Sequence, residues 1–117
     1  MGRVDLDLSK LSTLNAPSGP VVMLNLYRFK STEHREKFAE SMGSLMGPVL
    51  QRVGAEVIYG GSVAGEFVAG EEWDAIALVR YPSYQAFLEI FADSDVSAQI
   101  EQLRSAMLTE SRFMVTS

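Results

Sequence analysis

The segment Val21–Phe29 restricts the fold more than any other feature of this sequence, because a strand formed by it would be apolar on both sides. The run is too short for an independent helix and is rich in residues that favour strands, with Asn25 at its centre. A strand with two apolar faces must be covered by packed layers on both sides. The fold therefore has to cover both faces of this strand.

The pattern of a long helix follows this strand. Ser31 or Thr32 can cap its first turn, and apolar residues recur at helical spacing up to Gly54, which is expected to end it. Pro48 lies inside the pattern and removes one backbone hydrogen bond. A kink or a restart is therefore expected near Gly47–Pro48.

The rest of the sequence predicts an antiparallel hairpin, two helices and a last strand. In the hairpin we expect either a bulge or a close backbone approach at Gly60–Gly61, and a strand that resumes at 66–68. These elements are, in order, strands at 56–63 and 73–81, a helix capped by Ser83 that ends near Asp93–Ser94, a helix through Val96–Met107, and a strand at Ser111–Thr116.

This order of elements predicts an α+β fold, the ferredoxin-like βαββαβ sandwich, in which a four-stranded antiparallel sheet has its helices on one face. The strand at 73–81 is, like the first strand, apolar on both sides. Because the helices cover only one face, the cheapest cover for the other is a second copy of the same sheet. We therefore expect a homodimer, the dimeric α/β barrel.

Length and charge narrow the classes of partner. The 117 residues predict a lead-in segment at 1–19 and a single domain at 20–117. With 10 Lys and Arg against 15 Asp and Glu, the net charge of −5 argues against nucleic acid and against anionic membrane surfaces. The start of the chain carries acids rather than an apolar signal sequence, so we expect a cytoplasmic location and no membrane partner.

The sequence has no cysteine and one histidine, His34. The lack of cysteine excludes disulfides, thiolate nucleophiles, iron–sulfur clusters and cysteine-based zinc sites, and we expect no metal and no cofactor. A general base or a haem ligand would have to be His34, but its charged surroundings favour a solvated surface residue.

Three motifs resemble the domain of unknown function thirteen-thirty family, within the dimeric α/β barrel superfamily. They are Pro20–Phe29, Glu72–Ala75, and Arg80–Ser83 running into Ala86–Leu88. The resemblance covers residues 20 to 116 and implies a ferredoxin-like fold and a barrel-forming dimer, but no particular reaction. Members of that family often have His-Arg where this chain has Leu103-Arg104. Any chemistry that depends on that histidine would be absent here.

Two polar residues lie in apolar patterns and so need partners. Asn25 interrupts the first strand, and its amide can be satisfied by neighbouring protein groups or by a ligand. Arg104 lies at the edge of an apolar helical stripe, where a guanidinium requires an acid. Either an internal salt bridge or an acidic ligand would supply it; the internal candidates are Glu56, Glu66 and Asp74.

Other candidates lie in or beside the predicted strands. Arg28, Arg80 and Arg112 could converge as an anion pocket at the barrel mouth, or could form rim ion pairs with Asp74, Glu56 and Glu110. The aromatic residues either line an apolar cleft or fill the dimer core; they are Tyr27, Tyr59, Trp73 and Tyr81.

The residues favour a protein that binds a small, partly apolar or anionic molecule in the barrel, oriented by Asn25, Tyr59 and Arg104. If it is an enzyme, it would be a cofactor-free isomerase, decarboxylase or monooxygenase, and no catalytic residue is assigned. The alternative is a non-catalytic structural or interaction protein with a filled barrel. The presence or absence of a cavity separates the two hypotheses.

Overall fold

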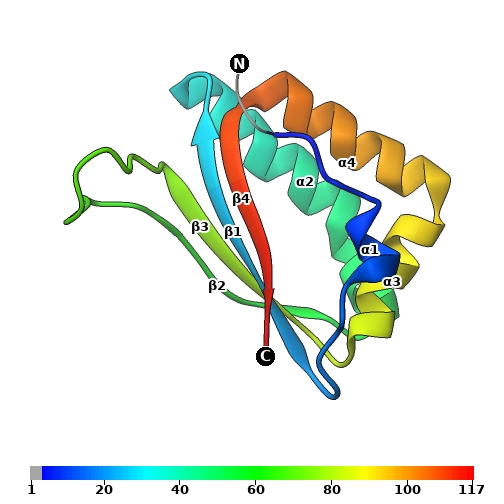
Figure 1. Ribbon diagram of the computed structural model, residues 1–117. Coiled ribbons are helices and arrows are strands. Elements are labelled where there is room, and N and C mark those ends of the chain that lie inside the picture. The colour runs from blue at the N-terminus through cyan, green and yellow to red at the C-terminus, as the bar shows by residue number, and fades with distance from the viewer. Residues whose placement is uncertain (1–3) are drawn as a thin grey trace.

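The computed structural model describes residues 4–117, with three long helices packed on one face of a four-stranded antiparallel sheet (Figure 1). The order of the strands in the sheet is β2-β3-β1-β4. This arrangement confirms the predicted ferredoxin-like fold. The elements are α1 (Lys10–Thr13), β1 (Val21–Phe29), α2 (Thr32–Val53), β2 (Glu56–Ser62), β3 (Ala75–Tyr81), α3 (Tyr84–Ala92), α4 (Ser94–Met107) and β4 (Leu108–Thr116).

β1 lies in the middle of the sheet, and its bounds agree with the prediction. Met23 pairs with Val79 of β3 and Val115 of β4, on the face that the helices cover. The next residue, Leu24, therefore faces the opposite side, which we call the outer face of the sheet. Both faces of β1 are thus apolar, but in the part of the chain that the structure describes, helices cover only one of them.

α2 is one continuous helix from Thr32 to Val53, so the expected restart at Pro48 is wrong. Its ends agree with the prediction, because Ser31 Oγ accepts the backbone N–H of His34 at 3.2 Å and Gly54 adopts a left-handed φ of 77°. Proline removes one backbone hydrogen bond of a helix, whereas the rest of this long helix is intact and packs against the core.

The hairpin differs from the prediction in two places. The register shift in β2 lies between Val57 and Tyr59 rather than at Gly60–Gly61, and no strand resumes at 66–68. Side chains in the connecting loop bind backbone groups instead, since Glu66 Oε1 accepts from Trp73 N–H at 3.1 Å. Such local hydrogen bonds compete with pairing between strands.

The last strand begins at Leu108, three residues before the predicted start at Ser111. Leu108 pairs with Phe29, the last residue of β1, after a register shift. The full length of the central strand thus sets the length of β4, which a local pattern does not show.

The core lies between the sheet and the helices, and its most buried side chains are Val21 and Ile90, with relative exposures of 0% and 1%. The outer face of the sheet carries a second apolar set, and no helix within residues 4–117 packs on it. These residues are Val22, Leu24, Leu26, Tyr59, Ile76, Leu78 and Met114. Within residues 4–117, no helix is long and apolar enough to cross a membrane.

The start of α3 gives a direct test of the predicted cap. Ser83 Oγ accepts the backbone N–H of Ala86 at 3.1 Å, so Ser83→Ala should lower the free energy of unfolding by about 1 kcal/mol. Urea unfolding followed by circular dichroism measures the change. Ser105→Ala, at an exposed position inside α4, is the control and should raise the free energy of unfolding slightly. Equal values for Ser83→Ala and the wild type would contradict the assigned cap.

Candidate functional site

A cavity of about 590 Å³ lies between the sheet and the helices, and we call it the central cavity. It is on the helix side of the sheet, not in the space that two sheets of a barrel would enclose. Most of its wall is apolar. The larger wall residues include Met23, Phe29, Phe38, Met42, Met46, Leu50, Ile90 and Phe113.

Small residues on two facing elements leave the space open. Ala39, Gly43 and Gly47 follow one another at four-residue spacing on α2, and Ala75 and Ala77 face them from β3. Side chains this small cannot fill the gap between a helix and a sheet. The spacing of these small residues was the sequence signal that could have predicted a cavity on this side.

Arg104 lies in the wall of the central cavity with a relative exposure of 4%. Its Nε donates to the carbonyl oxygen of Val4 at 3.0 Å, its Nη2 donates to Ser111 Oγ, and the guanidinium lies over the ring of Phe113. Within residues 4–117, no carboxylate forms an ion pair with it. Its hydrogen-bond partners in this part of the chain are all neutral.

The expected internal salt bridge is therefore wrong for each of the three carboxylates considered. Glu56 is paired with Arg80 at 3.9 Å, and Glu66 accepts the backbone N–H of Trp73. Asp74 Oδ2 accepts the backbone N–H of Phe29 at 2.8 Å. Each acid thus has a partner close to it in the fold, and the buried guanidinium has none of them.

Burial and nearby charges shift the pKa values of Arg104, Tyr27 and Tyr81. Burial lowers the pKa of Arg104, and the nearby Tyr27 phenol and Asp5 carboxylate act in the opposite direction. Burial raises the pKa of Tyr27 to about 12, although the positive charge of Arg104 opposes that rise. The pKa of Tyr81 is raised by burial and further by Tyr27. Both phenols thus keep their protons at neutral pH and can donate hydrogen bonds.

Asn25 also lines the central cavity and is 6% exposed. Its Nδ2 donates to the carbonyl oxygen of Ala77 at 3.4 Å, so part of the amide is satisfied by backbone, as one of the two interpretations expected. In the described part of the chain, neither Asn25 Oδ1 nor the hydroxyl groups of Tyr27 and Tyr81 form a hydrogen bond within the protein. These groups are available to a molecule in the cavity.

The three strand arginines do not converge. Arg28 and Arg112 both lie near Trp73, with their guanidinium carbons 5.3 Å and 4.9 Å from the centre of its ring, and a guanidinium nitrogen of each lies 3.8 Å from Glu110. Arg80 is opposite Val22, near the other end of β1. All three are outside the wall of the central cavity. Two of the three expected rim ion pairs, with Glu56 and Glu110, are present.

The aromatic candidates and His34 do not all lie in one site. Tyr27 and Tyr81 line the central cavity, whereas Tyr59 is 54% exposed and does not. Trp73 is buried, and its ring contacts the guanidinium groups of Arg28 and Arg112 rather than the central cavity. The ring of His34 lies at the start of α2, where Nδ1 is 2.6 Å from Ser31 Oγ, away from the cavity wall.

Sequence reasoning missed two partners of Arg104. Ser111 lies opposite Tyr27 in the sheet, and the two side chains share the face on which Arg104 packs. The carbonyl group of Val4 comes from a position 100 residues away in the chain. No local pattern marks a serine in a strand or a backbone carbonyl as a partner of a distant arginine.

The raised pKa of Tyr27 predicts a loss of stability at alkaline pH. The phenol of Tyr27 ionises near pH 10 in the unfolded chain, but its pKa in the folded protein is about 12. The free energy of unfolding should therefore fall as the pH rises from 10 towards 12. Urea unfolding between pH 8 and 11 measures this fall. Tyr27→Phe should reduce it, whereas Tyr59→Phe, at an exposed position, should not. Identical pH profiles for wild type and Tyr27→Phe would contradict the assignment.

Comparisons with known proteins place the chain among ferredoxin-like proteins. No family model matches it and no curated protein matches it, so the resemblance to the thirteen-thirty family is not confirmed. A crystal structure of RPA0582, a protein of unknown function from Rhodopseudomonas palustris, matches with a TM-score of 0.82 and 26% identity over 99% of this chain and 96% of that one.

Two more distant structures share the fold. A dabb-family protein with a ferredoxin-like fold from Mesorhizobium loti has a TM-score of 0.65 and 8% identity, over 85% of this chain and 96% of that one. A dimeric ferredoxin-like protein of unknown function from Thermobifida fusca has a TM-score of 0.62 and 14% identity, over 89% and 95%. This chain thus shares the ferredoxin-like fold of these structures.

Proposed function

We propose that this chain is a ligand-binding protein that holds a small, partly apolar carboxylic acid in the central cavity of each subunit of a homodimer. The observation that carries the proposal is the buried guanidinium of Arg104, which lies in the wall of an apolar cavity. It forms no ion pair within residues 4–117, and the Asp5 carboxylate acts on it only from a longer distance. A buried charge is stable only when an opposite charge or strong hydrogen bonds compensate it. A carboxylate ligand would supply the opposite charge.

The other polar groups of the cavity suit the same ligand. A guanidinium can bind both oxygens of a carboxylate, and the protonated phenol of Tyr27 can donate a further hydrogen bond to it. Asn25 can bind a second polar group of the ligand through its Oδ1. The aromatic and methionine side chains of the wall would hold an apolar body, in a volume within the usual range of ligand pockets.

Catalysis would be a further step on the same groups. Arg104, Tyr27 and Asn25 could polarise a bound carbonyl or carboxylate, which is compatible with cofactor-free isomerisation, decarboxylation or oxygenation. The proposal concerns binding, because the cavity and its charge support binding directly. The alternative is a non-catalytic structural or interaction protein with a filled barrel. The cavity of about 590 Å³ on the helix side of the sheet favours binding over that role, whether or not the barrel is filled.

The proposed binding can be tested with 3-phenylpropanoate, an apolar monocarboxylate, and protein labelled with ¹³C on the methionine methyl groups. Met42 and Met46 line the central cavity, whereas Met107 does not. We expect saturable shifts of the Met42 and Met46 signals and none at Met107. The corresponding alcohol, 3-phenylpropan-1-ol, should bind more weakly. If neither cavity methionine shifts at millimolar acid, the proposal is wrong.

The homodimer is proposed from the outer face of the sheet. Its apolar residues come from all four strands, and no helix among the described residues packs on them. Charged residues, including Arg28, Arg80, Glu56 and Glu110, lie at its margins. Contiguous apolar surface of this kind is typical of interfaces between subunits. Similar structures from Thermobifida fusca and Bacteroides fragilis are described as dimeric. Packing two outer faces together would close the barrel.

Native mass spectrometry of freshly purified protein tests both parts of the proposal. We expect a dimer, and retained non-covalent mass would identify a natural ligand. A monomer at micromolar concentration would contradict the homodimer without affecting the cavity, which lies within one subunit.

A further inference from the structure

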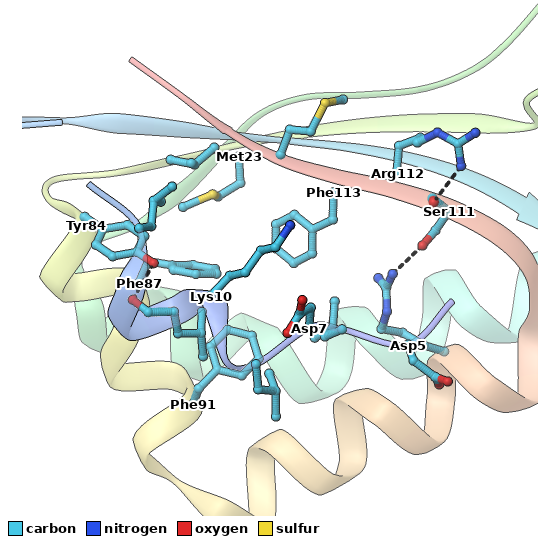
Figure 2. Close-up of a pocket in the computed structure, with 17 residues that line it drawn as sticks. Asp5, Asp7, Lys10, Met23, Tyr84, Phe87, Phe91, Ser111, Arg112 and Phe113 are labelled. Carbon is cyan, nitrogen blue, oxygen red and sulfur yellow. Dashed lines mark hydrogen bonds between the residues drawn. The ribbon is translucent and has the colours of Figure 1, made fainter. Parts of the chain in front are cut away.

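A second cavity, of about 620 Å³, lies beneath the N-terminal segment 4–14, which we call the strap (Figure 2). The strap crosses the side of the molecule between β4 and the helices α3 and α4 (Figure 1). Two hydrogen bonds fix it, from Tyr84 Oη to the carbonyl oxygen of Leu11 at 2.8 Å and from Arg104 Nε to that of Val4 at 3.0 Å. The strap therefore forms one wall of a defined space, which we call the strap cavity.

The strap cavity has a mainly apolar wall built from three parts of the chain. Leu6 and Leu11 come from the strap, Phe87 and Phe91 from α3, and Phe113 from β4. When an apolar group fills such a cavity, the apolar surfaces of the cavity wall and of the ligand are both removed from water, which favours binding. The apolar part of a ligand is thus expected to lie between the strap and the three phenylalanines.

Lys10 adds a positive charge to this wall. Figure 2 shows its side chain crossing the cavity from the strap, with the ammonium group directed towards the sheet. Within residues 4–117, Lys10 takes part in no ion pair. Asp5 and Asp7 line the same cavity, and their charges disfavour a ligand with more than one negative charge. The combination fits a single carboxylate on an apolar chain.

We propose that the strap cavity is a second binding site, which takes an apolar monocarboxylate of the fatty-acid type with its carboxylate at Lys10 and its chain among Phe87, Phe91 and Phe113. The site is distinct from the central cavity, because Lys10 lines only the strap cavity, whereas Tyr27 and Asn25 line only the central cavity. Met23, Phe87, Phe91, Arg104 and Phe113 belong to both walls, so the two cavities lie back to back.

Decanoate is the probe, with ¹³C-methyl labels on leucine and methionine. Leu6 and Leu11 line only the strap cavity, and Leu50 and Met46 line only the central cavity. We expect saturable shifts at Leu6 and Leu11. Lys10→Leu should lower the affinity for decanoate about fivefold, which is the effect of losing one partly exposed ion pair. Lys10→Arg should retain the affinity. The affinity for decanol should be the same in wild type and Lys10→Leu.

Lys37→Leu is the matched control, because Lys37 lies on α2, pairs with Glu33 at 3.2 Å and lines neither cavity. It should bind decanoate as the wild type does. Shifts confined to Leu50 and Met46 would assign decanoate to the central cavity and overturn the second site. Equal decanoate affinity in wild type and Lys10→Leu would overturn the role of Lys10, and the absence of any shift would overturn the site itself.

Discussion

Leu24→Asp is expected to convert the protein from a dimer to a monomer. Leu24 lies on the outer face of the central strand, between Leu78 and Met114, at the middle of the proposed interface. Two-fold symmetry would place one added carboxylate from each subunit in that interface, and each buried, unpaired charge costs several kcal/mol. The dissociation constant should therefore rise at least about a thousandfold.

Size-exclusion chromatography with light scattering at micromolar concentration measures this change. Gln102→Asp adds the same charge at an exposed position on α4 and should leave the dimer intact. Circular dichroism should show that both variants keep their secondary structure, because the outer face contributes little to the core of one subunit. A Leu24→Asp variant that is still a dimer would mean that another surface forms the interface.

Arg104→Met is expected to lower the affinity for 3-phenylpropanoate about thirtyfold or more. Removing one partner of a buried charge pair costs about 2 kcal/mol or more. The free energy of unfolding without ligand should stay equal or increase, because an apolar side chain of similar length replaces a buried charge that has only neutral partners in residues 4–117. If Arg104 serves to bind a ligand, the variant loses affinity but not stability. If Arg104 serves only the fold, the variant loses stability.

Titration calorimetry and urea unfolding give the two quantities. Arg112→Met is the matched control: it removes a guanidinium from the outer face, which does not line the central cavity, and should leave the affinity unchanged. Arg104→Lys should restore part of the affinity, because it restores the charge without the two-pronged geometry. Tyr27→Phe, which retains the ring, is a milder second variant and should weaken binding severalfold. Unchanged affinity in Arg104→Met would rule out this residue as the carboxylate partner.

Much of the fold could be predicted because its signals are local. The continuous apolar run at Val21–Phe29 gave the central strand with its correct bounds, and Ser83 and Gly54 marked helix ends that the structure confirms. Caps depend on residues within one turn of the helix, and a fully buried strand shows in its own composition. The elements that differed, β2 and the start of β4, are fixed by pairing with other strands.

The candidate site was predictable only in part, for a related reason. The position of Arg104 at the edge of an apolar stripe predicted its burial correctly. Its partners were not predictable, because Val4 and Ser111 reach it through the packing of the strap and the sheet, while the acids considered for it are bound elsewhere. Tyr59 and the strand arginines were placed with the site, but the alternation of the strands puts them on the opposite face or at its margins.

The sequence by itself thus determined the order of strands and helices and the need to cover both faces of β1. Only the tertiary structure decided where the open space lies. A cavity is the difference between the volume that the elements enclose and the volume that their side chains fill, and it depends on which residues face one another. Here the small residues of α2 meet Ala75 and Ala77 of β3, and the strap crosses beside β4, so both cavities arise from contacts between distant parts of the chain.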